Sequence, residues 1–325
     1  MNNKPRFKFA ILMLSLVLVA CSGGSAEAGC PEIDNREINV VATTPMIGEF
    51  VSQVGGDNIN LTVLMPPEAD PHTYDPAPQD AGKIADADLV FYTGLKYEPA
   101  ALIKLLENSA CSAEVLAEVG ENVFPIEFKE EGHDDHDEEG HDDHAGHDHG
   151  AYDPHFWFDP NRVAYAAEYI ESKLVEFDPS NASDYEAAGK AYVTELKGLV
   201  SQVSELISTI PSQNRKLITT HESLGYLEAK FGLEVLSTII PSVDSANEIS
   251  PSQLVGVIDV IEDNNVKAIF IEAEAPSVYA ETIVAETGIK AVEGLWVETL
   301  KEGQSYPEFL FEAVELIVEN LKNTD

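Results

Sequence analysis

The sequence contains few positively charged residues. Only 19 of its 325 residues are Lys or Arg, against 58 that are Asp or Glu, and the formal net charge is −39. This balance excludes nucleic acid as a partner, because phosphate groups would be repelled, and it disfavours close contact with anionic lipid. An excess of carboxylates attracts cations, although most of these charges equally fit a solvated acidic surface.

Long apolar runs are also scarce. Residues 9–20 are almost wholly apolar and follow three basic residues, but they are too few to span a bilayer comfortably. The run ends in Leu-Val-Ala-Cys, which resembles a bacterial lipobox with Cys21 as the lipidated residue. We therefore predict a lipoprotein signal peptide over residues 1–20 and a lipidated tether over residues 21–37. The protein is expected to be extracytoplasmic and anchored to a membrane.

Cysteine is rare as well, with three residues in the chain. Once Cys21 is assigned to the lipid, Cys30 and Cys111 remain, and neither lies in a metal-binding spacing. An even pair outside the cytoplasm is compatible with a disulfide, but spacing alone leaves open whether the two are close enough to form one.

The short signatures of several enzyme classes are missing. The chain has no Gly-x-Ser-x-Gly nucleophile elbow, no P-loop and no Gly-x-Gly-x-x-Gly motif. His221 and Glu222 begin like the His-Glu-x-x-His motif of zinc peptidases, but Gly225 stands where the second histidine is required. We therefore predict that the chain is not an enzyme.

Predicted strands and helices alternate along most of the chain, which indicates parallel sheets covered by helices. The expected fold is α/β, with two α/β lobes, each built on a mainly parallel sheet. Residues 38–178 form the amino-terminal lobe and residues 212–325 the carboxyl-terminal lobe, joined by a long rigid helix over residues 179–211. Ligands of such sheets bind at the carboxyl ends of strands, so we expect the site in the cleft between the lobes.

The alternation is interrupted by residues 129–150, which are acidic and rich in histidine. The segment has one apolar residue, Ala145, and is therefore predicted to be a disordered loop. It contains six of the nine histidines: His133, His136, His141, His144, His147 and His149. We predict that these histidines form a low-affinity metal-collecting loop, while a mere solubilising linker is the alternative.

The other three histidines are His72, His155 and His221. Each lies at a predicted junction of strand and helix, where α/β proteins place their ligands. Imidazole is a common metal ligand, and no histidine of the chain is left for another purpose. These three residues are the candidate tight metal site.

The segments around these histidines carry a family resemblance. Residues 70–76 (DPHTYDP), 153–160 (DPHFWFDP), 219–232 (TTHESLGYLEAKFG) and 264–272 (NNVKAIFIE) resemble motifs of the metal-binding solute-binding proteins of ABC importers, the cluster A-I (cluster 9) group typified by ZnuA and TroA. The resemblance extends from Asn39 to the carboxyl terminus. It implies a monomer that delivers metal to an ABC transporter permease and, through the permease, to its cytoplasmic ATPase.

The resemblance also implies the ligands. His72, His155 and His221 take three of the family's positions, and Glu298 takes the fourth, where the family usually has aspartate. Glutamate is one methylene longer than aspartate, so Glu272, Glu274 or a water molecule are alternatives for the fourth ligand.

Three imidazoles and one carboxylate favour Zn²⁺ over Mn²⁺, which prefers more oxygen ligands. Family members selective for manganese tend to have glutamate at the third position, where this chain has His221. We therefore predict capture of Zn²⁺. The alternatives are a manganese-binding homologue, or an extracellular zinc buffer or adhesin without an importer.

Overall fold

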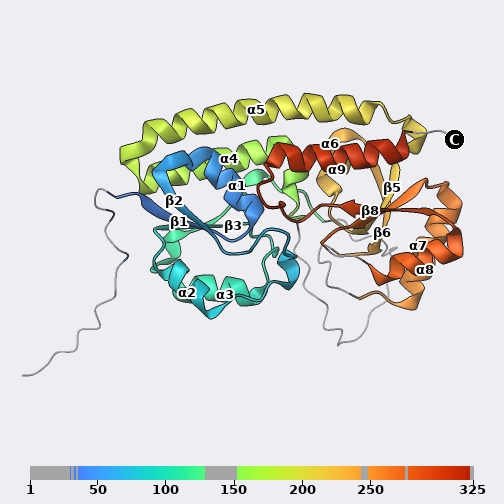
Figure 1. Cartoon of the computed structure of the whole chain (residues 1–325), viewed down its shortest axis with the longest axis horizontal. Coiled ribbons are helices and arrows are strands. Elements are labelled where there is room, and N and C mark those ends of the chain that lie inside the picture. Colours follow the sequence, from blue (N-terminus) through green and yellow to red (C-terminus); the bar gives the residue numbers. More distant parts are fainter. Residues whose placement is uncertain are drawn as a thin grey trace, which may run out of the picture.

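The computed structural model describes residues 36–128, 152–242, 248–274 and 277–322, together with Cys30 and Ile33. In these residues the chain forms two α/β lobes side by side, and a long helix runs across both (Figure 1). Each lobe has one four-stranded sheet in which all neighbouring strands are parallel. The predicted fold class is confirmed.

The amino-terminal sheet has the strand order β2-β1-β3-β4. Its strands are β1 (Ile38–Ala42), β2 (Ile59–Val63), β3 (Leu89–Tyr92) and β4 (Leu116–Glu118). The two central strands, β1 and β3, are almost wholly apolar because both of their faces are covered. The sequence did not predict β4, since three residues are too few to show a period of two.

Helices cover the two faces of this sheet. They are α1 (Pro45–Gly55), α2 (Pro78–Ala85) and α3 (Ala100–Ser109). Val40 belongs to the core that includes α1, whereas its neighbour Val41 packs with residues of α2 and α3. This alternation follows from the pleat of a strand, in which successive side chains point to opposite faces.

The carboxyl-terminal lobe repeats this topology with the strand order β6-β5-β7-β8. Its strands are β5 (Lys216–His221), β6 (Glu234–Ile240), β7 (Ala268–Glu272) and β8 (Lys290–Leu295). Its helices are α6 (Gly225–Phe231), α7 (Pro251–Asn264) and α8 (Val278–Thr287). In both sheets the first strand in sequence pairs with the second strand on one side and with the third on the other. The two sheets therefore have the same topology.

Three further helices are α4 (Pro160–Phe177), α5 (Ala182–Ser208) and α9 (Tyr306–Leu321). In Figure 1, α5 runs across both lobes, whereas α4 lies with the amino-terminal lobe and α9 with the carboxyl-terminal lobe. The 27 residues of α5 give a length of about 40 Å. One continuous hydrophobic core contains residues of both lobes and of all three helices, so the connection is packed rather than a free linker.

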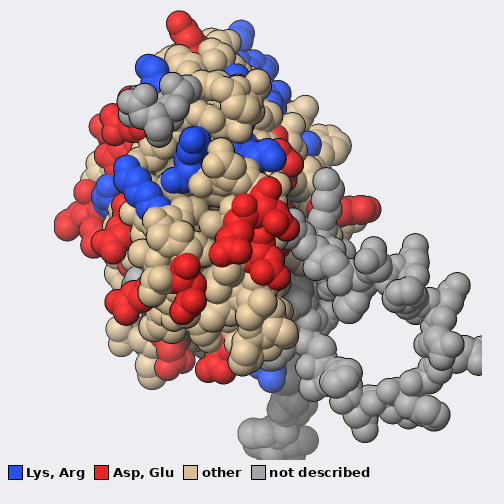
Figure 2. All heavy atoms as spheres, turned by 90° about the vertical axis from the view of Figure 1, so that its right-hand side faces the viewer, with Lys and Arg blue, Asp and Glu red and all other residues tan. Residues whose placement is uncertain are grey.

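The positive charges of the carboxyl-terminal lobe are not spread evenly. Lys216 and Lys290 begin β5 and β8, and Lys267 precedes β7, so all three mark the amino ends of strands. Figure 2 shows Lys and Arg side chains gathered in a band on this end of the molecule, with Asp and Glu around it. The carboxyl ends of these strands, at the opposite edge of the sheet, carry none of these three lysines.

A disulfide joins Cys30 to Cys111, with an S–S distance of 2.00 Å. The pairing that the sequence left open is thus present. It ties the segment before β1 to the turn that follows α3, within the amino-terminal lobe.

Several predictions concern residues outside the described part of the chain. These are the signal peptide over residues 1–20, lipidation of Cys21, and the histidine-rich loop over residues 129–150. Among the helices of the described residues, none is long and apolar enough to cross a membrane.

Candidate metal centre

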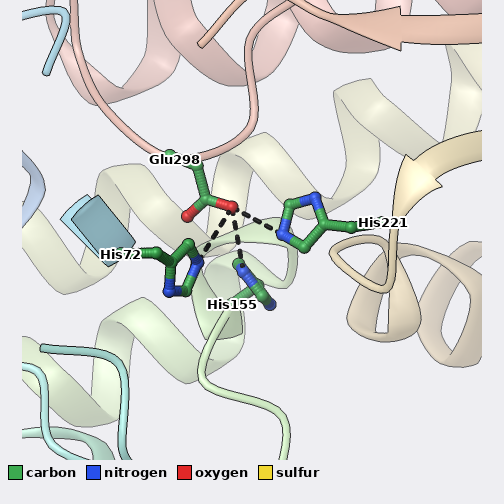
Figure 3. Close-up of side chains that lie close together, drawn as sticks. All are labelled: His72, His155, His221 and Glu298. Carbon is green, nitrogen blue, oxygen red and sulfur yellow. Dashed lines mark hydrogen bonds and ion pairs between the residues drawn. The ribbon is translucent and has the colours of Figure 1, made fainter. Parts of the chain in front are cut away.

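Four side chains from four separate segments meet between the lobes: His72, His155, His221 and Glu298 (Figure 3). His72 lies in a 3-10 turn after β2, and His155 immediately precedes a second 3-10 turn that leads into α4. His221 is the last residue of β5, and Glu298 follows β8. Each lobe therefore contributes two of the four residues, as expected for a site in an interlobe cleft.

One carboxylate oxygen is the centre of this arrangement. Oε1 of Glu298 lies 2.7 Å from Nε2 of His221, 3.2 Å from Nε2 of His155 and 3.4 Å from Nε2 of His72. The four candidate ligand atoms lie within 4.8 Å of one another. Ligands bound at about 2.0–2.1 Å to a tetrahedral Zn²⁺ are about 3.3 Å apart, so the four atoms need little movement to surround such an ion.

The site excludes water. The side chains of His155, His221 and Glu298 have no exposed surface, and that of His72 is 4% exposed. Apart from their contacts with Oε1 of Glu298, Nε2 of His72 and Nε2 of His221 are buried without a hydrogen-bond partner, and Oε2 of Glu298 has none either. Buried polar atoms without such partners are costly, and a bound cation would satisfy the imidazole nitrogens.

His155 is oriented by the acid two residues before it. Oδ1 of Asp153 lies 2.8 Å from Nδ1 of His155 and also accepts the His155 backbone N–H at 2.8 Å. A proton held at Nδ1 leaves the lone pair of Nε2 free for a metal. Asp153 is itself buried, and its backbone carbonyl accepts the hydroxyl of Tyr226 at 2.9 Å.

His221 is oriented in the same way by Glu272, the last residue of β7. Oε2 of Glu272 lies 2.5 Å from Nδ1 of His221, while Oε1 accepts the His221 backbone N–H at 3.2 Å and the Ser223 hydroxyl at 3.1 Å. Because β5 and β7 are neighbouring parallel strands, their carboxyl ends bring these residues together.

The two glutamates considered as alternative fourth ligands have other partners. Glu272 holds His221, and Glu274 accepts backbone N–H groups of Val297, Glu298 and Thr299. Neither belongs to the group of side chains that converges with the three histidines. The geometry therefore brings Glu298, and not these alternatives, to the fourth position.

The electrostatics of the site couple the histidines to Glu298. Burial lowers the pKa of His155, but Glu298 and Asp153 more than offset this and raise it to about 9. Burial likewise opposes protonation of His221, while Glu272 and Glu298 raise its pKa well above the usual range. Burial raises the pKa of Glu298, but His155, His72 and His221 hold it well below its usual range. Without metal, the raised pKa values of His155 and His221 favour the protonated form of these two rings, which competes with metal.

This arrangement suits holding an ion rather than transforming a molecule. Four protein ligands close a tetrahedral site, whereas catalytic zinc sites keep one position open for water or substrate. Sequence reasoning missed that two carboxylates orient the histidines, although it named Glu272 as an alternative ligand. Asp153 could have been found from the Asp-Pro-His motif, but Glu272 is brought to His221 only by strand pairing.

Comparisons with known proteins agree with this fold. The model of the ZnuA family, described as "Zinc-uptake complex component A periplasmic", matches residues 40–320. A metal ABC transporter substrate-binding lipoprotein, ScbA of Streptococcus cristatus, is 28% identical over 98% of this chain and 99% of its own length. The manganese ABC transporter substrate-binding lipoprotein scaA of Streptococcus gordonii is 27% identical over the same shares of the two chains.

Among solved structures, the periplasmic zinc-binding protein TroA of Treponema pallidum has a similar fold. The TM-score is 0.75, the sequence identity 22%, and the superposition covers 88% of this chain and 100% of TroA. The family model matches most of the chain, so the chain belongs to the ZnuA family, whose members are substrate-binding components of metal ABC transporters and not enzymes.

Proposed function

We propose that the chain captures Zn²⁺ outside the cytoplasm in the site formed by His72, His155, His221 and Glu298, and delivers the ion to the permease of an ABC importer. The observation that carries this proposal is the convergence of three imidazole Nε2 atoms and one carboxylate oxygen, all within 4.8 Å, in a buried space. The family to which the chain belongs supports the transport role.

The choice of zinc over manganese rests on ligand chemistry. Three nitrogen ligands and one oxygen suit a four-coordinate Zn²⁺, whereas Mn²⁺ prefers a larger number of oxygen ligands. Manganese is the second candidate, because several similar proteins are named as manganese-binding, including those of Streptococcus gordonii and Halalkalibacterium halodurans. What favours zinc here is His221, whose Nδ1 is committed to Glu272 and whose Nε2 faces the site.

Metal competition tests this choice. The mature protein, stripped of metal, is titrated with Zn²⁺ and with Mn²⁺ by calorimetry, and the bound metal is measured after exposure to both. We expect one tight Zn²⁺ per chain that Mn²⁺ in excess does not displace. Tighter binding of Mn²⁺ would overturn the zinc proposal and leave the manganese alternative.

We also propose that the protein is held at a membrane by lipid on Cys21 and acts there with a permease and its ATPase. The amino-terminal sequence and the relatives named as lipoproteins support this. Growth and zinc uptake of a deletion strain in zinc-limited medium test the importer role. Unchanged uptake, with a protein that still binds zinc, would favour a zinc buffer or adhesin.

The histidine-rich segment over residues 129–150 is proposed to collect metal loosely for the cleft site. It carries ten carboxylates against the single Lys129, so it raises the local concentration of cations. Deleting the segment should remove the weak binding sites and slow uptake at low zinc, without changing the tight site. If neither weak binding nor uptake changes, the segment is a solubilising linker.

We also propose a structural role for each part of the chain. Residues 38–178 and 212–325 act as the two lobes of a monomer, and residues 179–211 act as the rigid connection between them. The long helix α5 and the hydrophobic core that it shares with both lobes support this rigid connection. On the side of α5, the two halves of the site are therefore held in a fixed position relative to each other. Sedimentation of the zinc-loaded protein tests the monomer, and a dimer would contradict it.

A further inference from the structure

The fourth ligand, Glu298, lies in a turn whose backbone is held by one neighbouring carboxylate. Oε1 of Glu274 accepts three successive backbone N–H groups, from Val297 at 3.1 Å, from Glu298 at 3.0 Å and from Thr299 at 3.3 Å. Convergence of consecutive amides on one oxygen forms a compact anion-binding nest. Glu274 therefore defines the path of the backbone from which the Glu298 side chain extends.

The position of Glu274 follows from the sheet. It lies two residues beyond β7, and the 297–299 turn begins two residues beyond β8, the parallel neighbour of β7. The backbone N–H of Ala273 still donates to the carbonyl of Leu295 at 2.8 Å, so the ladder between the strands continues to the base of this turn.

The opposite side of the same turn is held by the amino-terminal lobe. The indole N–H of Trp157 donates to the carbonyl of Val297, and the hydroxyl of Tyr97 donates to the carbonyl of Glu298, both at 2.8 Å. The amides are thus fixed by one lobe and the carbonyls by the other. Such a doubly held turn fixes the backbone position from which the Glu298 side chain extends.

The consequence is visible in the orientation of the Glu298 carboxylate. Oε1 lies within 3.4 Å of all three Nε2 atoms, whereas Oε2 is buried without a hydrogen-bond partner (Figure 3). One oxygen toward three nitrogens gives a four-coordinate set, which suits Zn²⁺, while a second oxygen or a water would raise the coordination number toward that preferred by Mn²⁺.

We propose that Glu274 is a positioning residue that sets the metal selectivity of the site, because its hold on the 297–299 turn makes Glu298 present a single oxygen. This inference rests on the proposed zinc-binding function. It identifies how a glutamate, one methylene longer than the aspartate usual in the family, fits a four-coordinate site.

Variants of Glu274 separate positioning from charge. Glu274→Ala removes the acceptor of the three amides, and zinc affinity should fall about 10–100-fold, the range for losing an outer partner of a metal ligand. The ratio of zinc affinity to manganese affinity should fall at least about tenfold, because a less constrained Glu298 can offer Mn²⁺ the additional oxygen ligand that it prefers. Glu274→Gln keeps one acceptor oxygen. Its zinc affinity should therefore stay within about threefold of that of the unchanged protein, a much smaller change than the loss expected for Glu274→Ala.

Co²⁺ substitution supplies a readout that a merely structural role would not move. The intense visible bands of four-coordinate Co²⁺ are expected in the unchanged protein and in Glu274→Gln, and the weak bands of higher coordination in Glu274→Ala. Glu293→Gln, which removes an exposed carboxylate from β8, is the matched control and should change neither the spectrum nor the affinity ratio. If Glu274→Ala does not fold, Glu274→Asp tests the same point, because it keeps the carboxyl group but withdraws the acceptor.

This inference would be overturned if Glu274→Ala kept the metal selectivity and the Co²⁺ spectrum of the unchanged protein. If Glu274→Ala is unfolded, the same result in Glu274→Asp would overturn it. An equal loss in Glu274→Gln and Glu274→Ala would also overturn it, because charge rather than the acceptor would then be responsible. Failure of the unchanged protein to bind Zn²⁺ at all would instead reject the proposed function, so the two failures are distinguishable.

Discussion

Nε2 of His155, in the amino-terminal lobe, lies 3.2 Å from Oε1 of Glu298, in the carboxyl-terminal lobe. Both side chains have no exposed surface, so this contact joins the lobes through two polar groups away from water. A proton can bridge them when no metal is present, and a metal can bridge them when it is bound. The protonation of this pair, and its competition with metal, underlie the two predictions on pH.

Replacing His155 by alanine should abolish tight metal binding. The change removes one of the four ligands and one of the three imidazoles that face the buried Glu298 carboxylate, so the Kd for Zn²⁺ should rise by more than the 10–100-fold or so typical of outer partners. Calorimetry with purified protein measures this. Glu319→Gln, at an exposed position of α9, removes a carboxylate elsewhere and should leave the Kd unchanged. Full retention of tight binding when His72, His155 and His221 are all replaced would reject the site.

The stability of the metal-free protein should fall as the pH rises from about 6.5 to about 9. The pKa of His155 is about 9 in the folded protein, above the value of about 6.5 for an unfolded chain. Its contribution is therefore complete below about pH 6.5 and is lost as the pH passes about 9, and it amounts to about 3 kcal/mol. Thermal unfolding across this range measures the loss, and His155→Ala should show a flatter profile.

Zinc binding should have the opposite pH dependence. The imidazoles must lose their protons before they can bind metal, so affinity should rise from pH 6.5 to 9, and binding at pH 7 should release protons. Calorimetry in buffers of different ionisation enthalpy reports the number released. An affinity that is independent of pH would show that the histidines are already neutral in the metal-free protein.

Glu272→Gln should weaken zinc binding without changing the number of ligands. The carboxylate of Glu272 orients His221 through Nδ1 and raises its pKa, so its loss should lower zinc affinity about 10–100-fold and reduce the proton release. The Co²⁺ spectrum should stay that of a four-coordinate ion, in contrast to Glu274→Ala. An unchanged affinity would mean that packing alone holds the His221 ring.

Replacing Cys30 and Cys111 by serine should lower stability but not metal affinity. The two cysteines are 81 residues apart in the sequence, so the disulfide closes a large loop. Such a cross-link contributes about 2–4 kcal/mol to the free energy of unfolding. Denaturant unfolding with and without reductant measures the difference, and the double serine variant should not respond to reductant. A large loss of zinc affinity would show that the bond also shapes the cleft.

Local patterns were sufficient for most of the fold. Strands such as β1 and β7 are nearly continuous apolar runs, and the alternation of strands and helices can be read along the chain, because apolar periodicity is local in sequence. β4 could not be found, because its three residues become a strand only by pairing with β3.

The sequence by itself determined the three candidate histidines, since their motifs, their spacing and the grouping of the other six histidines in one acidic segment are properties of the chain alone. It could not choose among Glu298, Glu272 and Glu274, because all three lie at or just beyond the carboxyl ends of strands in the same lobe. Only the tertiary structure decided, by giving Glu272 to His221 and Glu274 to the backbone amides of the 297–299 turn. The physical reason is that parallel pairing fixes which strand ends are neighbours, and a buried carboxylate takes whichever donors that pairing places beside it.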